Sequence, residues 1–177
     1  SLAVDLVIGA GDLGLVRKGL AETIQALQTI EKPTILVPGN SESLEELEDA
    51  AKSWTQATVL HGSGMNFSGI PFYGVGGGIP VTPFGDWSYD FTEDEARKLL
   101  AGCPPGGVLI THSPPKGAVD ISSAGQRFGS EAIRETILEN QPRLCVCGHI
   151  HESAENHATL GETFVVNAGP EGIIWEL

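Results

Sequence analysis

The chain has 177 residues, of which 41% are hydrophobic and 19% charged, a composition typical of a globular domain and not of a disordered chain. Ten basic and 23 acidic residues give a net charge of −13 with no cluster of Lys or Arg, so binding to DNA or RNA is disfavoured unless bound cations reverse the sign locally. No apolar run approaches the length of a membrane span. We therefore expect residues 1–177 to form one soluble domain that does not bind membranes.

The first half of the chain alternates short apolar runs with amphipathic stretches. In chain order we predict a strand at Val4–Ile8, a helix at Arg17–Ile30, a strand at Thr34–Gly39, a helix at Leu44–Trp54, and strands near Thr58–Leu60 and Ile70–Val75. The second of these helices begins with a capping box, because Ser43 is followed by Glu46 three residues later.

A long loop rich in glycine, proline and aromatic residues follows at 76–91, and its simplest interpretation is a surface loop, with a lid or stacking platform as the alternative. The elements predicted after it are a helix from Thr92 to Leu100, a strand at Gly107–Thr111, a helix at Ser130–Asn140, a strand at Arg143–Cys147, a hairpin within 159–167 and a closing strand at 172–177. This order predicts one α/β domain with a mixed sheet or two facing sheets.

The three cysteines indicate a reduced protein. An odd number of cysteines without C-x-x-C spacing argues against a disulfide framework or a thiolate zinc site. Cys145 and Cys147 alternate with Val146 in a strand-like run, so we interpret them as small buried residues. A reducing compartment such as the cytoplasm fits this usage.

The stretch Gly9–Gly14 reads GAGDLG and allows two interpretations. As G-x-G-x-x-G after a strand it would be a dinucleotide-binding turn, which needs an acidic residue about twenty positions later to hold the ribose. The second strand ends instead in Pro38-Gly39-Asn40, without a carboxylate. The alternative, a strand end that offers the carboxylate of Asp12 to a metal ion, is therefore favoured.

Potential metal ligands follow four predicted strands, where α/β folds usually carry function. They are Asp12, Asn40, His112, His149 and His151. Oxygen and imidazole donors without thiolates suit Mn, Fe, Zn or Mg. His149 and His151 are two residues apart, so on extended backbone both would project to the same side.

Four motifs occur in order at these strand ends: Gly11-Asp12, Gly39-Asn40, His112–Pro115 and Gly148–His151. With this set the chain resembles the calcineurin-like metallophosphoesterase superfamily. The resemblance implies a four-layer α/β/β/α sandwich of two mixed sheets with two divalent metal ions. It implies that Asp12 bridges both ions, that Asn40, His112 and His149 complete one site, and that His151 belongs to the other.

The activity implied by this resemblance is metal-dependent hydrolysis of a small phosphate ester, more specifically of a phosphodiester. Two divalent cations would polarise the phosphoryl oxygens and activate a water to attack phosphorus. A different class of function is the alternative: a protein-interaction scaffold that keeps the fold with a degenerate metal site.

Two departures from the family pattern support that alternative. The family's first motif, D-x-H, is absent from the eleven residues before Asp12, and we expect that the chain lacks the first strand and helix of the fold by truncation. Ser41 stands where many members carry a histidine that is assigned to the leaving group or the phosphate. Asn40 and Ser41 are therefore the catalytic candidates beside the metal ligands.

Overall fold

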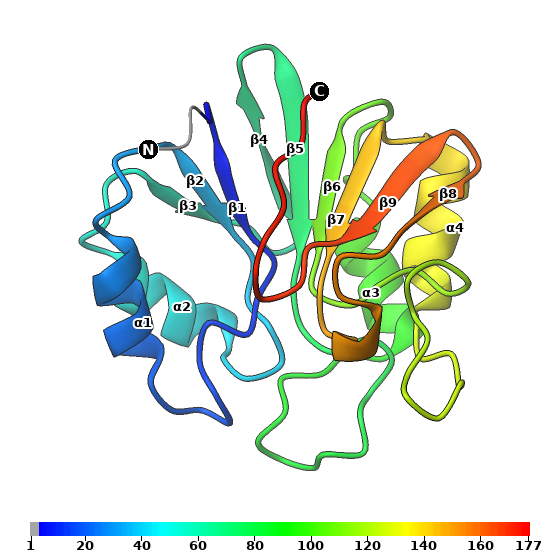
Figure 1. Ribbon diagram of the computed structural model, residues 1–177, viewed down its shortest axis with the longest axis horizontal. Helices are drawn as coiled ribbons and strands as arrows, with labels where there is room; N and C mark the ends of the chain where they lie inside the picture. The colour runs from blue at the N-terminus through cyan, green and yellow to red at the C-terminus, as the bar shows by residue number, and fades with distance from the viewer. Residues whose placement is uncertain (1–3) are drawn as a thin grey trace.

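The computed structural model describes residues 4–177 as two facing sheets with helices on their outer sides (Figure 1). The strands are β1 (Val7–Gly9), β2 (Thr34–Leu36), β3 (Ala57–Val59), β4 (Ser63–Phe67), β5 (Ile70–Val75), β6 (Val108–Thr111), β7 (Leu144–Cys147), β8 (His157–Leu160) and β9 (Thr163–Asn167). The helices are α1 (Leu20–Leu27), α2 (Leu44–Ala51), α3 (Glu93–Leu100), α4 (Glu131–Asn140) and the short 3-10 helix η1 (His151–Ser153). None of the helices in residues 4–177 has the length and apolar character needed to cross a membrane.

The two sheets differ in strand direction. The smaller sheet has the order β1-β2-β3, and its described strands are all parallel. The larger sheet has the order β4-β5-β6-β7-β9-β8, in which β5, β6, β7 and β9 are parallel and the edge strands β4 and β8 are antiparallel to their neighbours. The parallel strands direct their carboxyl ends toward one edge of the molecule, which is the lower edge in Figure 1.

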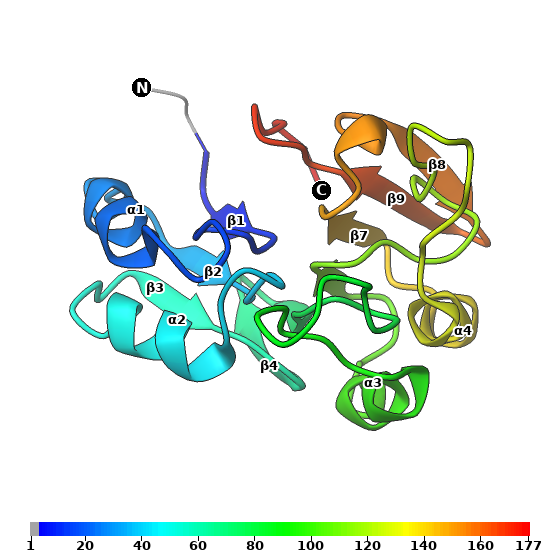
Figure 2. The same ribbon diagram turned by 90° about the horizontal axis from the view of Figure 1, so that it is seen from below.

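Alternation along the strands divides the interior into three apolar layers. In β6, Val108 and Ile110 face the smaller sheet, whereas Leu109 faces α3 and α4. Leu36 of β2 faces α1 and α2, while its neighbour Ile35 faces the larger sheet. The order of layers is therefore helices, small sheet, large sheet, helices, which confirms the predicted four-layer sandwich (Figure 2).

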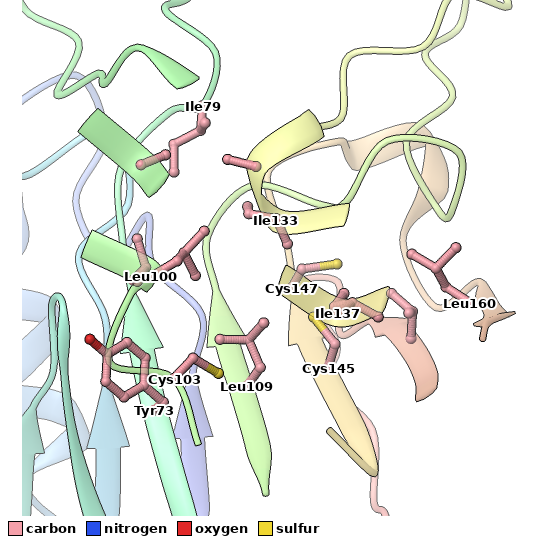
Figure 3. Close-up of a cluster of buried hydrophobic side chains, with 14 of the residues drawn as sticks. Tyr73, Ile79, Leu100, Cys103, Leu109, Ile133, Ile137, Cys145, Cys147 and Leu160 are labelled. Atoms are coloured by element: carbon pink, nitrogen blue, oxygen red, sulfur yellow. The ribbon is translucent and has the colours of Figure 1, made fainter. Parts of the chain in front are cut away.

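The layer between the large sheet and its helices contains all three cysteines (Figure 3). All three are buried free thiols, as their strand-like context predicts for Cys145 and Cys147. Burial raises the pKa of the Cys145 thiol to about 12 and that of the Cys147 thiol well above its ordinary value. Both side chains therefore act as small apolar core residues.

The predicted elements before residue 168 are confirmed, with local differences at their ends. The capping box of Ser43 and Glu46 is present, and Thr92 forms a second one with Glu95 at the start of α3. Helix α1 begins at Leu20 and not at Arg17, because residues 15–18 form a tight two-stranded turn and Gly19, with a φ of 76°, caps the helix.

One predicted strand is absent, and one observed strand has no counterpart among the predictions. The prediction of a closing strand at 172–177 is wrong, because this segment is exposed coil. It contacts β9 through the ring of Trp175, which stacks on the ring of Phe164 with the ring centroids 4.2 Å apart. Strand β4 was not predicted, because its sequence is mostly polar and exposed and carries little apolar alternation. It pairs with β5 through a two-residue turn in which Ser68 and Gly69 both have positive φ.

Two neighbouring residues on α4 test the layer between the helices and the large sheet. Ile137 is fully buried in it, whereas Leu138 is 42% exposed on the outer side of the helix. We expect Ile137→Ala to lower the free energy of unfolding by about 2–5 kcal/mol, through lost transfer energy and a cavity. Leu138→Ala, the matched control, should change it by about 0.5 kcal/mol or less. Urea unfolding of both variants measures this difference, and equal effects would contradict the layer assignment.

Candidate metal centre

The predicted metal ligands lie in loops at the carboxyl ends of strands from both sheets. Asp12 follows β1 and Asn40 follows β2 in the smaller sheet, while His112 follows β6 and His149 follows β7 in the larger one. These loops gather at the edge of the molecule that faces the viewer in Figure 2. The site is therefore assembled across the junction of the two sheets.

Two glycines allow the first two loops to touch. Gly11 has a φ of 90°, and a Cβ there would lie 2.5 Å from the Cα of Gly39 and 2.6 Å from the Nδ1 of His112. A Cβ on Gly39 would overlap the backbone nitrogen and a carboxylate oxygen of Asp12. The Gly-Asp and Gly-Asn motifs thus have a steric cause: only glycine permits this backbone contact.

A buried carboxylate holds the same two loops together. Glu42 is 1% exposed, and its carboxylate accepts hydrogen bonds from the backbone N–H groups of Gly39 at 2.7 Å, Gly14 at 3.0 Å and Leu13 at 3.2 Å. These bonds to backbone N–H groups satisfy the carboxylate away from water. The residue was not predicted from the sequence, because its donors are brought to it only by the fold.

Four donor atoms converge in this site. The Nε2 of His112 lies 3.1 Å from the Oδ1 of Asn40, 3.1 Å from the Nδ1 of His149 and 3.5 Å from the Oδ1 of Asp12. The ligand atoms of Asp12, His112 and His149 all lie within 4.8 Å of one another. Neighbouring ligands that bind one cation at about 2.1 Å are themselves about 3.0–3.4 Å apart, so the three contacts of the His112 Nε2 have a spacing that suits a metal ion.

The hydrogen bonds of His112 give an independent test of this fit. Its Nδ1 lies 2.8 Å from the carbonyl oxygen of Ala10, which can only accept, so the Nδ1 carries a proton. In the neutral form that binds metals, the Nε2 of His112 has a lone pair, which points toward the amide oxygen of Asn40 at 3.1 Å. A cation between them could be coordinated by both atoms, and an Nδ1–H oriented by a carbonyl oxygen is typical of metal-binding histidines.

His149 is held in the form that binds metals. Burial, and next the nearby His112, lower its pKa to about 4, so its ring is neutral near pH 7. Neutral imidazole is the ligand form of histidine. Its backbone φ of 65° turns the ring toward His112, with ring centroids 4.8 Å apart.

His151 does not follow His149 on extended backbone. The left-handed backbone at His149 ends the extended conformation, and His151 begins η1 with an exposed side chain. The side-chain amide of Asn167 stabilises this bend by donating to the carbonyl oxygens of Gly148 at 3.1 Å and Ile150 at 2.9 Å. The expectation that both histidines project from extended backbone is therefore wrong, and the role of His151 in a second metal site stays a prediction.

Ser41 contributes to the site through its backbone. Its N–H donates to the Oδ1 of Asp12 at 2.9 Å, and its carbonyl accepts from the backbone N–H of Arg17 at 3.1 Å. The residue is 5% exposed and lines a groove with Arg17 and Glu46, which form an ion pair. Ser41 thus orients the carboxylate of Asp12, while a role for its hydroxyl stays a prediction.

Comparison with known proteins agrees with this geometry. The family model for calcineurin-like phosphoesterases matches residues 1–153. The uncharacterised protein MJ1162 of Methanocaldococcus jannaschii is 30% identical over 179 residues, which cover 94% of this chain and 78% of that protein. Metallophosphoesterase domain-containing protein 1 of Homo sapiens is 34% identical over 129 residues, or 70% of this chain and 38% of that protein. The chain thus spans less of the human relative than of the archaeal one.

A solved structure has the same fold. The protein TT1561 of Thermus thermophilus superposes with a TM-score of 0.72 at 20% sequence identity, over 94% of this chain and 77% of that one. At this identity the likeness concerns the fold alone. Together with the family match and the identity to MJ1162, the ordered donors at the sheet junction lead to one conclusion: this chain belongs to the calcineurin-like phosphoesterase family of metal-dependent phosphoesterases.

Proposed function

We propose that this protein hydrolyses a small phosphodiester with the help of two divalent metal ions, in a reducing compartment such as the cytoplasm. The observation that carries the proposal is the convergence of four ligand side chains: polar atoms of Asp12, Asn40 and His149 lie 3.1–3.5 Å from the Nε2 of His112. When bound, divalent cations would supply Lewis-acid polarisation of the phosphoryl oxygens and activation of a water.

The chain's own residues have distinct parts in this proposal. Asp12 would bridge the ions, because its carboxylate has two oxygens and its orientation is fixed by the N–H of Ser41. Asn40, His112 and His149 would hold one ion, and His151 would help to hold the other. Glu42 holds the loops of Asp12 and Asn40 in contact, so it positions ligands without itself belonging to the donor cluster.

Charge supports a small diester over a polymer or a monoester. The net charge of −13 opposes the approach of anions, and the opposition grows with the charge of the substrate. A phosphomonoester carries close to two negative charges near pH 7, a diester one, and a nucleic acid one for each phosphate. We therefore propose that nucleic acids are not substrates.

Metal-dependent turnover is the direct test. We expect the protein with Mn²⁺ to hydrolyse bis(p-nitrophenyl) phosphate faster than p-nitrophenyl phosphate, and EDTA to stop the reaction. Asp12→Asn and His149→Gln should reduce kcat/KM by at least about 10²-fold, because each removes a ligand of the metals. Asp86→Asn, which removes an exposed carboxylate of the loop at 76–91, is the control and should leave kcat/KM unchanged.

A metal-dependent phosphodiesterase and a protein-interaction scaffold would give different results in this assay. Mn²⁺ binding without turnover of either ester would contradict the enzyme and favour the interaction scaffold. Unchanged turnover in the Asp12→Asn and His149→Gln variants would show that the reaction does not take place at this metal centre.

Ser41 sets the expected dependence on the leaving group. A serine hydroxyl is too weak an acid to protonate a leaving oxygen near neutral pH. We therefore expect aryl esters to react much faster than alkyl esters, and Ser41→Ala to cost little. Ser41→His should help alkyl esters most, by up to about 10²–10⁴-fold, the usual contribution of a positioned acid.

The measurement is log(kcat/KM) against leaving-group pKa for both proteins. A shallow slope that the histidine leaves unchanged would mean that another residue already serves as the acid.

A further inference from the structure

A chain of hydrogen bonds leads from the metal centre into the loop at 76–91. The side-chain amide of Asn40 donates from Nδ2 to the Oγ of Ser88 at 2.9 Å. The hydroxyl of Ser88 donates to the Oδ1 of Asp90 at 2.7 Å. The other oxygen of Asp90 accepts from the backbone N–H of Thr82 at 2.8 Å and from its hydroxyl at 2.6 Å. Asn40 is thus connected to a carboxylate through one serine.

The direction of each bond in this chain follows from the carboxylate at its end. A carboxylate only accepts hydrogen bonds, so the single proton of the Ser88 hydroxyl points to Asp90. The oxygen of Ser88 then offers only lone pairs to Asn40 and must face its N–H₂ group. The amide oxygen of Asn40 consequently faces His112, where a metal ligand is needed.

Without this constraint the opposite orientation of the amide would be favourable. When His112 is in its neutral, metal-binding form, a flipped Asn40 would donate from Nδ2 to the lone pair of His112 Nε2 and so remove the contact between two acceptors. Its oxygen could then accept the proton of Ser88. The flipped form would block the metal position with an N–H group.

We propose that Ser88 and Asp90 are positioning residues that hold the Asn40 amide with its oxygen toward the metal centre, so that the site is ready to bind a cation. The inference rests on the proposed metal site and adds to it two residues outside the donor cluster.

The loop is built to keep this arrangement. The backbone N–H of Tyr89 donates to the carbonyl oxygen of Asn40 at 2.9 Å, so the loop and the ligand residue are bonded twice. Gly78 lies against Asp90, and a Cβ there would overlap the Oδ1 that receives the Ser88 proton. Backbone bonds from Gly78 to the carbonyl of Tyr89 and from Phe91 to the carbonyl of Gly78 fix both sides of Asp90.

The experiment measures the dissociation constant of Mn²⁺ by calorimetric titration of metal-free protein. We expect Ser88→Ala and Asp90→Asn each to weaken Mn²⁺ binding by about 10- to 100-fold, as found for groups that orient metal ligands. Ser88→Thr keeps the hydroxyl and should restore native binding. Asp86→Asn removes the same charge as Asp90→Asn from an exposed position of the loop, and should change the constant by less than about twofold.

A second background separates orientation from general loosening of the loop. Asn40→Asp replaces the amide by a carboxylate whose two oxygens are equivalent, so no orientation has to be enforced. In this background Ser88→Ala should weaken Mn²⁺ binding by less than about threefold, and the difference between backgrounds is the coupling of the two residues.

The outcomes are distinct. Native affinity in both Ser88→Ala and Asp90→Asn, while the native protein binds Mn²⁺, would overturn this inference and leave the proposed function standing. An equal loss from Ser88→Ala in the native and the Asn40→Asp backgrounds would also overturn it, since the loop alone would then be responsible. Absence of Mn²⁺ binding by the native protein would overturn both.

Discussion

The contact between the loops that follow β1 and β2 is the constraint on which the site depends. Gly11 and Gly39 bring the two backbones together, and the buried carboxylate of Glu42 ties them through three N–H groups. Asp12 and Asn40 each lie next to one of these glycines, so a side chain at either glycine would separate the two ligands. The apolar layer between the sheets then sets the distance from these loops to the histidines of the larger sheet, because packed interiors resist deformation.

Two atoms at the centre of the site can both accept hydrogen bonds from, or coordinate, a positively charged group. The Nε2 of His112 and the amide oxygen of Asn40 face each other at 3.1 Å, and both are acceptors when His112 is in its neutral, metal-binding form. Two acceptors in contact are unfavourable in the absence of a positive charge, and the surrounding hydrogen bonds hold both groups in place. Ala10 fixes the ring of His112, and Ser88 holds the amide of Asn40. The arrangement that favours binding of the ion is therefore less stable than the alternatives when no ion is bound.

Local signals in the sequence predict one α/β domain and polar residues at its strand ends, and the four-layer arrangement follows from the family resemblance. The short apolar runs of β6 and β7, the capping boxes at α2 and α3, and the polar residues after the strands led to Asp12, Asn40, His112 and His149 as candidate ligands. Local signals failed where the polypeptide is not in its preferred conformation. The positive φ of His149 has no sequence signature, and it ends the extended backbone that the prediction for His149 and His151 assumed.

The hydrogen bonds that hold the ligand side chains in place connect segments far apart in the sequence, so they can be recognised only in the folded structure. Glu42 bonds Leu13 and Gly14 across 29 and 28 positions of sequence, Asn40 bonds Ser88 across 48, and His112 bonds Ala10 across 102. The bonds that join the loop at 76–91 to Asn40 likewise exist only in the folded protein. The physical reason is that a local pattern reports which face of an element is buried, but not which loops meet when two sheets pack.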